Sequence, residues 1–152
     1  MPRTASSPSR TVVWRGLDAP RMEVAHVESD QVRGTQVGIA YELRYELEPR
    51  RLRLEVVGGP SAEVELAGAD FFDLAFSPLF NSLPIWAGLD GRRDFTMRFV
   101  DVPSLEVSES AQRYEPLAPD RVRFRSGSFT ADIEIDADGF VVRYPELAEL
   151  LA

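Results

Sequence analysis

The chain has 152 residues, of which 44% are hydrophobic and 28% are charged, as is typical of one globular domain. It has no cysteine, which excludes disulfides, thiolate zinc sites, iron–sulfur clusters and thiol nucleophiles. The formal net charge is −8, and the 17 basic residues are arginines dispersed among 25 acidic residues, so we expect no nucleic-acid partner.

The first ten residues differ in composition from the rest of the chain. The segment MPRTASSPSR is rich in serine, proline and arginine and lacks the apolar core of a secretory signal. We therefore expect a disordered tail over residues 1–10 and a single domain over residues 11–152. No run of about 18 apolar residues occurs, so we expect no transmembrane segment and a cytoplasmic location.

Alternating apolar and polar residues predict strands in the first half of the chain. A period-two pattern begins near residue 37, and its apolar members are Tyr41, Leu43, Tyr45 and Leu47. A turn at residues 48–51 and a second alternating run at 52–56 predict a hairpin with arginines opposite glutamates on its solvent face. Gly58-Gly-Pro60 ends this hairpin, and a third short strand follows at residues 63–66.

The central segment FSPLFNSLPIWAGLDG, residues 76–91, interrupts the alternation. Ser77-Pro78 is typical of a helix start, with serine as the cap and proline in the first turn. Pro84 lies about two turns further on and is expected to kink the helix. The segment therefore predicts a short, kinked α-helix over about residues 77–88.

The apolar residues of this predicted helix do not lie on one side. Leu79, Leu83 and Trp86 fall on one stripe, while other apolar residues point elsewhere, so the helix is expected to be buried. Asn81 and Ser82 must then find hydrogen-bond partners inside the protein, because each would otherwise cost about 1–3 kcal/mol. We therefore expect a curved sheet that wraps around this apolar helix.

The second half of the chain returns to alternation, for about nine or ten strands in all. Its predicted strands lie near residues 95–99, 105–107, 122–124, 129–135 and 140–144. Asp138-Gly139 predicts a hairpin turn. Pro145 to Leu151 predicts a short C-terminal helix, with proline at its first position. A mainly β, antiparallel fold that closes or stacks to hide its apolar faces is expected.

The residues contain no constellation typical of catalysis. His26 is the only histidine, and it follows Glu23 by three residues, which supports neither a metal site nor a catalytic triad. No glycine-rich phosphate loop and no nucleophile elbow occur. With 25 acids, a chance carboxylate pair is common. We expect no metal, no cofactor and no catalytic residue, and a binding role is favoured over an enzyme.

Several blocks of the sequence form a pattern when they are taken together. They are residues 73–85, 102–107, 112–114, 129–131 and 138–145, with Trp14 and Glu23 upstream. Over about residues 11–150 this pattern resembles the bacterial putative glycolipid-binding family with the spiral β-roll fold. The resemblance implies an antiparallel sheet wrapped around one helix, a homodimer, and a lipid or glycolipid as partner.

The candidate ligand-binding residues combine the apolar helix with the positions that match the family. They are Trp14, Glu23, Asp73, Phe80, Asn81, Trp86, Gln112, Tyr114 and Tyr144. We expect an apolar cavity beside the helix, with the acyl part of a lipid against Phe80 and Trp86. The polar head would meet Asp73, Asn81 or Gln112. Trp86-Ala87 replaces an arginine pair that is common in the family.

Two alternatives remain open at this point. One is a homodimeric interaction module that binds no ligand and predicts a large apolar interface without a pocket. The other is a carboxylate-dependent hydrolase or isomerase, which predicts an acid with a raised pKa facing a cleft. Glu23 and Asp73 are the acids that this alternative singles out.

Overall fold

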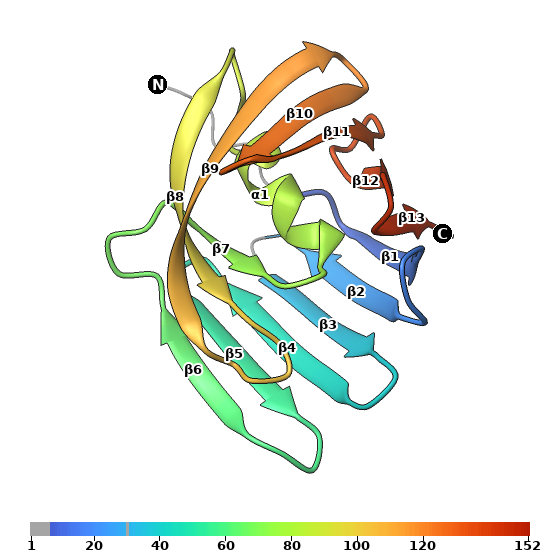
Figure 1. The fold of residues 1–152 in the computed structure, drawn as a ribbon, viewed down its shortest axis with the longest axis vertical. Coiled ribbons are helices and arrows are strands. Elements are labelled where there is room, and N and C mark those ends of the chain that lie inside the picture. The colour runs from blue at the N-terminus through green and yellow to red at the C-terminus, as the bar shows by residue number, and fades with distance from the viewer. Residues whose placement is uncertain (1–6, 30) are drawn as a thin grey trace.

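Short alternating segments pair edge to edge into one large sheet in the computed structural model, which describes residues 7–29 and 31–152 (Figure 1). The sheet has 13 strands over these residues, more than the nine or ten expected. The strands are β1 (Arg10–Gly16), β2 (Met22–Glu28), β3 (Gln31–Val37), β4 (Glu42–Glu48), β5 (Arg51–Val56), β6 (Ser61–Glu65), β7 (Phe71–Leu74), β8 (Arg93–Val100), β9 (Val107–Ala118), β10 (Arg121–Ser126), β11 (Phe129–Ile135), β12 (Val141–Tyr144) and β13 (Ala148–Leu150). Most of the tail predicted at residues 1–10 lies outside the described residues, and the single domain stays a prediction.

The sheet is open and curls around the helical segment, with the order β6-β5-β4-β3-β2-β1-β13-β12-β11-β10-β9-β8-β7 (Figure 1). A mainly β roll around one short helical segment is thereby confirmed. One pair departs from the antiparallel pattern, because β7 runs parallel to β8. The helical segment lies between these two strands and carries the chain back to the start of β8, as a parallel crossover requires.

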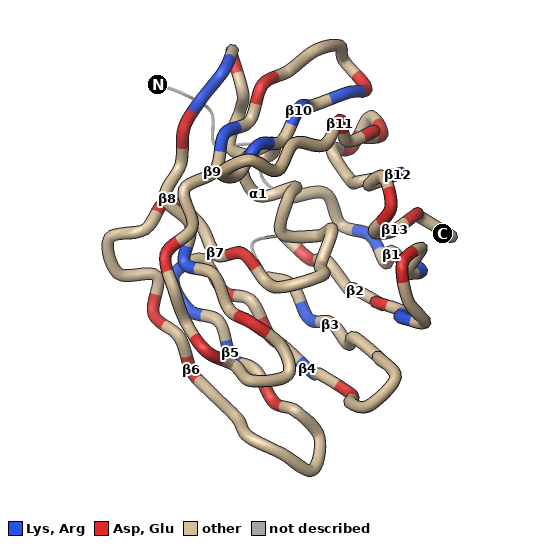
Figure 2. Tube along the Cα trace, viewed as in Figure 1, with Lys and Arg blue, Asp and Glu red and all other residues tan. Residues whose placement is uncertain are grey.

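The register of the β4–β5 hairpin confirms the alternation seen in the sequence. Arg44 pairs with Glu55, and Glu46 pairs with Arg53. The side chains of Leu43 and Leu47 are buried on the opposite face. Figure 2 shows that acidic and basic residues are spread along the chain. In the described part of the chain, no helix combines the length and apolar character needed to cross a membrane.

The predicted C-terminal helix is wrong. A turn leads into β13, where Ala148 pairs with Gly16 of β1 and with Tyr144 of β12. Glu146 has a positive φ of 66°, which a right-handed helix cannot contain. The three-residue strand provides hydrogen-bond partners for the backbones of β1 and β12 at once. These hydrogen bonds outweigh the helical preference that the spacing of the leucines indicates.

The central segment is helical, with a different internal structure from the one expected. A 3₁₀ helix, η1 (Pro78–Asn81), leads directly into α1 (Ser82–Trp86). Proline occupies the first turn of η1 as predicted, but the Ser77 hydroxyl makes no capping bond. Pro84 is the third residue of α1, where a missing N–H costs little, so the irregularity is the change from 3₁₀ to α geometry before it.

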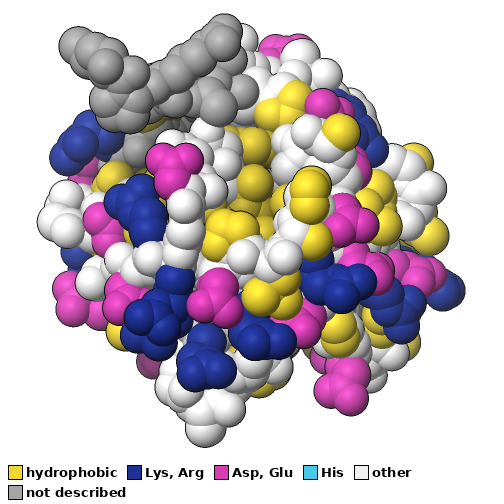
Figure 3. Space-filling model, turned by 90° about the horizontal axis from the view of Figure 1, so that it is seen from above, with side chains coloured by type: hydrophobic (Ala, Val, Ile, Leu, Met, Phe, Trp, Pro, Cys, Tyr) yellow, Lys and Arg dark blue, Asp and Glu magenta, His cyan; other side chains and the backbone are white. Residues whose placement is uncertain are grey.

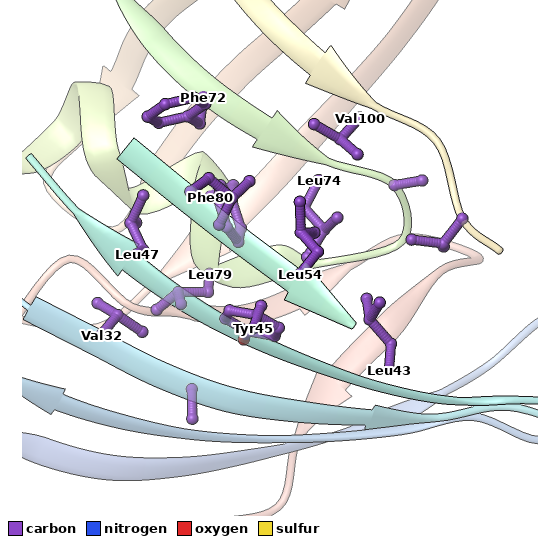
Figure 4. Close-up of a cluster of buried hydrophobic side chains, with 14 of the residues drawn as sticks. Val32, Leu43, Tyr45, Leu47, Leu54, Phe72, Leu74, Leu79, Phe80 and Val100 are labelled. Atoms are coloured by element: carbon purple, nitrogen blue, oxygen red, sulfur yellow. The ribbon is translucent and has the colours of Figure 1, made fainter. Parts of the chain in front are cut away.

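The helical segment fills the inside of the roll. Leu79 and Phe80 are fully buried, and Figure 4 shows them among side chains of the surrounding strands. The Phe80 ring meets Tyr45 edge to face, with ring centroids 5.7 Å apart. The concave side of the sheet therefore packs against η1 and α1, as expected for a helix that is apolar all round.

Candidate functional site

A cleft of about 350 Å³ lies beside the end of β7, and we call it the Asp73 cleft. Its lining includes Asp73, Asn81, Gln112 and Tyr144, four of the residues predicted from the sequence. They come from β7, η1, β9 and β12, so only the rolled sheet brings them together. Polar groups of several kinds thus converge on one opening, as in many ligand sites.

A chain of hydrogen bonds supports the polar side of this cleft. The Asn81 amide donates to the Tyr114 hydroxyl over 3.0 Å, and this hydroxyl donates to Gln112 Oε1 over 3.3 Å. Gln112 Nε2 then donates to Asp73 Oδ2 over 2.7 Å. Tyr114 and Gln112 are two residues apart on β9 and face the same side. Each polar group is therefore held in one orientation.

The electrostatics of the Asp73 cleft are neutral to acidic. Burial raises the pKa of Asp73 to about 6, while the hydrogen bonds from Gln112 and from the Leu74 backbone oppose the shift. Asp101 lines the same cleft, and none of the described lining residues is basic. Asp73 can therefore accept hydrogen bonds when ionised and donate one when protonated.

Four aromatic residues that the sequence reasoning did not select also line the Asp73 cleft, and two of them, Phe76 and Phe129, are exposed. Phe76 follows β7, Phe129 begins β11, and both side chains are substantially exposed. Phe76 has a positive φ of 63°, and the Arg21 guanidinium lies 4.3 Å from the centroid of its ring. Both residues belong to blocks that carry the family resemblance, which was the signal available in the sequence.

A second, apolar pocket of about 280 Å³ lies beside α1, and we call it the Trp86 pocket. Leu83, Trp86 and Ala87 line it from the helical segment, and Phe71 and Phe72 line it from β7. In the space-filling view of Figure 3, hydrophobic side chains gather near the middle of the face seen from above. Successive residues of β7 line the two sites, with Phe71 and Phe72 in the Trp86 pocket and Asp73 and Leu74 in the Asp73 cleft.

Trp86 combines pocket lining with a structural contact. Its indole N–H donates to the Asp138 carbonyl over 2.8 Å. Its ring meets Phe140 edge to face with centroids 5.3 Å apart. The predicted turn at Asp138-Gly139 is confirmed, and Gly139 adopts a φ of 83° there. Trp86 therefore holds the β11–β12 turn against the helix.

Glu23 is buried behind the Asp73 cleft, with 2% of its surface exposed. Ser77 donates to Glu23 Oε1 over 2.9 Å, and Gln36 Nε2 donates to Oε2 over 2.8 Å. Burial raises the pKa of Glu23 to about 7, and these hydrogen bonds partly counter the shift. The Tyr45 hydroxyl and Gln36 Oε1 have no hydrogen-bond partner among the described residues. The Tyr45 hydroxyl lies beside Glu23 and could accept the hydrogen bond that a protonated carboxyl must donate.

The remaining predicted residues are part of the core. Trp14 is buried and donates its indole N–H to the Val141 carbonyl over 2.7 Å. Phe80 is buried among core side chains and lines neither the cleft nor the pocket. Tyr114 lies directly behind the Asp73 cleft. Within residues 7–29 and 31–152, no group of three or more acidic, histidine or cysteine side chains is placed to hold a metal ion.

The architecture defines the class of this protein as a spiral β-roll, a single curved sheet wound around one helical segment. The model of the family described as "Putative glycolipid-binding" matches residues 53–149, and the chain belongs to this family. A crystal structure of a DUF1089 family protein from Pseudomonas aeruginosa shares the fold, with a TM-score of 0.76 over 90% of this chain and 94% of that chain. The two sequences are 22% identical. None of the curated proteins compared with the chain matches it.

Proposed function

We propose that residues 11–152 form one domain that binds a glycolipid or a related amphipathic lipid without transforming it. The observation that carries this proposal is the convergence of Asp73, Asn81, Gln112 and Tyr144 on one cleft. The family description supports the same class of ligand. In this proposal the polar head of the lipid occupies the Asp73 cleft.

The chemistry of the Asp73 cleft suits a headgroup rich in hydroxyl groups. A hydroxyl both donates and accepts hydrogen bonds, and the carboxyl group of Asp73 accepts them when ionised and donates one when protonated. The hydrogen-bond chain from Asn81 orients these groups before a ligand arrives. Because little side-chain freedom remains to be lost, binding costs less entropy.

The Trp86 pocket supplies an apolar site for an acyl chain. Trp86 and Ala87 give this pocket apolar surface without positive charge. The pocket has few polar groups that an acyl chain would leave unpaired. Phe80, expected in this role from the sequence, contributes as core packing behind the helix.

Organic extraction of the purified protein followed by mass spectrometry tests the proposal. We expect a stoichiometric lipid in the wild type, a reduced amount in Asp73→Asn, and a reduced amount in Ala87→Trp, which fills the Trp86 pocket. Val142→Ala, an exposed position that lines neither site, serves as the matched control. Folded wild-type protein that neither carries a lipid nor takes one up from a total lipid extract would contradict the proposal.

A homodimer is a second candidate, supported by an apolar surface on the outer face of the sheet. Met22 and Val37 are cross-strand neighbours on β2 and β3, with 45% and 50% of their surfaces exposed. Exposed neighbouring apolar side chains are typical of protein contacts. Light scattering of the wild type and of a Met22→Glu, Val37→Lys double variant tests this assembly. A wild-type monomer at high concentration would contradict it.

Asp73 also meets the criterion set for a carboxylate-dependent hydrolase, because its pKa is raised and it faces a cleft. In that alternative, Asp73 acts as a general acid at a glycosidic bond and Asp101 is the second carboxyl group of the cleft. Turnover of aryl glycosides that disappears in Asp73→Asn would favour hydrolysis over binding alone.

A further inference from the structure

We propose that the Asp73 cleft is a subsite for an uncharged pyranose ring, in which Phe129 is the stacking surface and Asp73, positioned by Gln112, binds ring hydroxyls. This inference rests on the proposed lipid-binding function and specifies the headgroup class. Phe129 is the new element, because neither the family description nor the sequence reasoning assigns it a role.

Phe129 is an inward-facing side chain that residues 7–29 and 31–152 leave half exposed. It lies on the same face of β11 as Ala131 and Ile133, which are buried on the concave side of the sheet. Even so, 50% of the surface of Phe129 is exposed, and the residue lines the Asp73 cleft. An aromatic ring on the concave face that remains open to solvent is available to a ligand.

The Phe129 ring is held in place by its aromatic neighbours. It stacks on Tyr144 with an interplanar angle of 18° and a centroid distance of 6.4 Å. Phe124 contacts it edge to face at 6.1 Å, and Tyr114 contacts Phe124 at 5.3 Å. This row of rings crosses four adjacent strands, from β9 to β12. The ring is therefore oriented before binding, as a stacking surface must be.

A pyranose ring matches this combination of an aromatic face and fixed polar groups. The C–H groups of the sugar form an apolar face that packs on an aromatic ring, while the hydroxyls project from its edge. Asp73 lines the same cleft as Phe129 and is held by the Gln112 carboxamide, and its carboxyl group keeps free lone pairs for hydroxyls at that edge. A purely aliphatic ligand would make no hydrogen bond with Asp73 and would displace the water that solvates its carboxyl group.

The charge of the Asp73 cleft selects against anionic headgroups. Asp73 and Asp101 line it, none of its described lining residues is basic, and the protein carries a formal charge of −8. The Arg21 guanidinium, which lies on the Phe76 ring at this cleft, is already paired with Asp18. A phosphate or sulfate would therefore meet carboxylates without an unpaired guanidinium in the lining to neutralise it. The headgroup class is thus a glycoside without charge.

Two probes with the same chain and different heads test the inference, namely n-octyl β-D-glucopyranoside and n-octyl sulfate, each below its micelle concentration. Amide chemical shifts in ¹H–¹⁵N spectra report which site each probe reaches. We expect the glucoside to shift amides around Asp73, Gln112 and Phe129, and the sulfate to leave them unchanged. Phe129→Ala should weaken glucoside binding at the cleft at least fivefold, with Val142→Ala as the exposed control.

Phe129→Leu keeps an apolar side chain but removes the flat ring, so it should also weaken glucoside binding. This variant distinguishes stacking on an aromatic ring from simple apolar contact. Equal binding of glucoside and sulfate at the cleft, or unchanged affinity in folded Phe129→Ala, would overturn the pyranose subsite. Binding of both probes only at the Trp86 pocket would overturn the subsite and leave lipid binding standing. Binding of neither probe anywhere would overturn both proposals.

Discussion

The hydroxyl of Ser77 donates a hydrogen bond of 2.9 Å to the buried carboxyl of Glu23, 54 positions earlier in the chain. This bond ties the start of the central helical segment to β2, on the first half of the sheet. It also explains why Ser77 does not cap the helix, because its hydroxyl already has a partner. The residue before it, Phe76, lines the Asp73 cleft, so the bond anchors part of the cleft wall.

The first prediction concerns the pH dependence of stability. The pKa of Glu23 is about 7 in the folded protein, above its ordinary value of 4.5. The folded state therefore holds a proton on Glu23 that the unfolded state releases. Glu23 makes its full contribution to the free energy of unfolding below pH 4.5, and this contribution is lost as the pH rises through 7. The loss amounts to about 3 kcal/mol at most. Asp73, with its pKa raised to about 6, acts in the same direction.

Glu23→Gln removes one of these two titrating groups. Denaturant unfolding at a series of pH values should show a smaller fall in stability for Glu23→Gln than for the wild type between about pH 5 and pH 8. The absolute stability of the variant matters less than this difference in slope. Parallel pH profiles for the two proteins would show that Glu23 titrates normally.

The second prediction concerns Gly34 on β3, which leaves room for Tyr45. A Cβ atom added at Gly34 would lie 2.3 Å from both Cζ and the hydroxyl of Tyr45. Because Tyr45 is buried, Gly34→Ala should lower the free energy of unfolding by about 1–3 kcal/mol. Gly68→Ala is the matched control, since nothing lies within 4 Å of its added Cβ. Equal stability of the two variants in denaturant would refute this account.

The third prediction concerns the hydrogen bond between Gln112 and Asp73. Gln112→Met keeps the side-chain length but removes the donor that stabilises the ionised carboxyl. The pKa of Asp73 should therefore rise above its present value of about 6. Carbon-13 NMR titration of the Asp73 carboxyl measures this shift directly. Gln31→Met, the same substitution at an exposed position outside the cleft lining, should leave the titration curve unchanged. A lower pKa in Gln112→Met would contradict the assigned geometry.

The fourth prediction concerns β13, which joins the two halves of the sheet. Ala148 is buried and pairs with β1 on one side and β12 on the other. Ala148→Asp places a charge without a partner at this junction and should cost more than about 3 kcal/mol. Leu151→Asp, at an exposed position three residues later, should change stability by less than about 0.5 kcal/mol. Thermal unfolding followed by circular dichroism distinguishes the two outcomes.

Local periodicity was sufficient to predict which side chains face the core. Leu43 and Leu47 point inward, and Arg44 lies opposite Glu55, because residues on a strand alternate faces whatever the strand pairs with. The burial of the central segment was predictable for a similar reason. A helix with apolar residues on every side cannot remain exposed, and Leu79 is indeed fully buried.

The sequence also indicated the polar residues of the candidate site, through the family resemblance, but not their arrangement. Asp73 and Gln112 are 39 positions apart, and their hydrogen bond depends on how β7 and β9 are placed by the roll. The exposure of Phe129 could not be predicted either, because the pattern of β11 marks it as an inward residue. Phe129 is available because none of the described elements covers it fully.

Taken by itself, the sequence determined the strands, the faces they bury, the helical centre and the family. The tertiary structure decided that the C-terminal segment is a strand, that Ser77 bonds Glu23, and that Asp73 and Phe129 share a cleft. The physical reason is the range of the interactions. Face and helix patterns arise from neighbouring residues, whereas strand order and side-chain partners depend on contacts between distant segments that form only when the sheet curls around its helix.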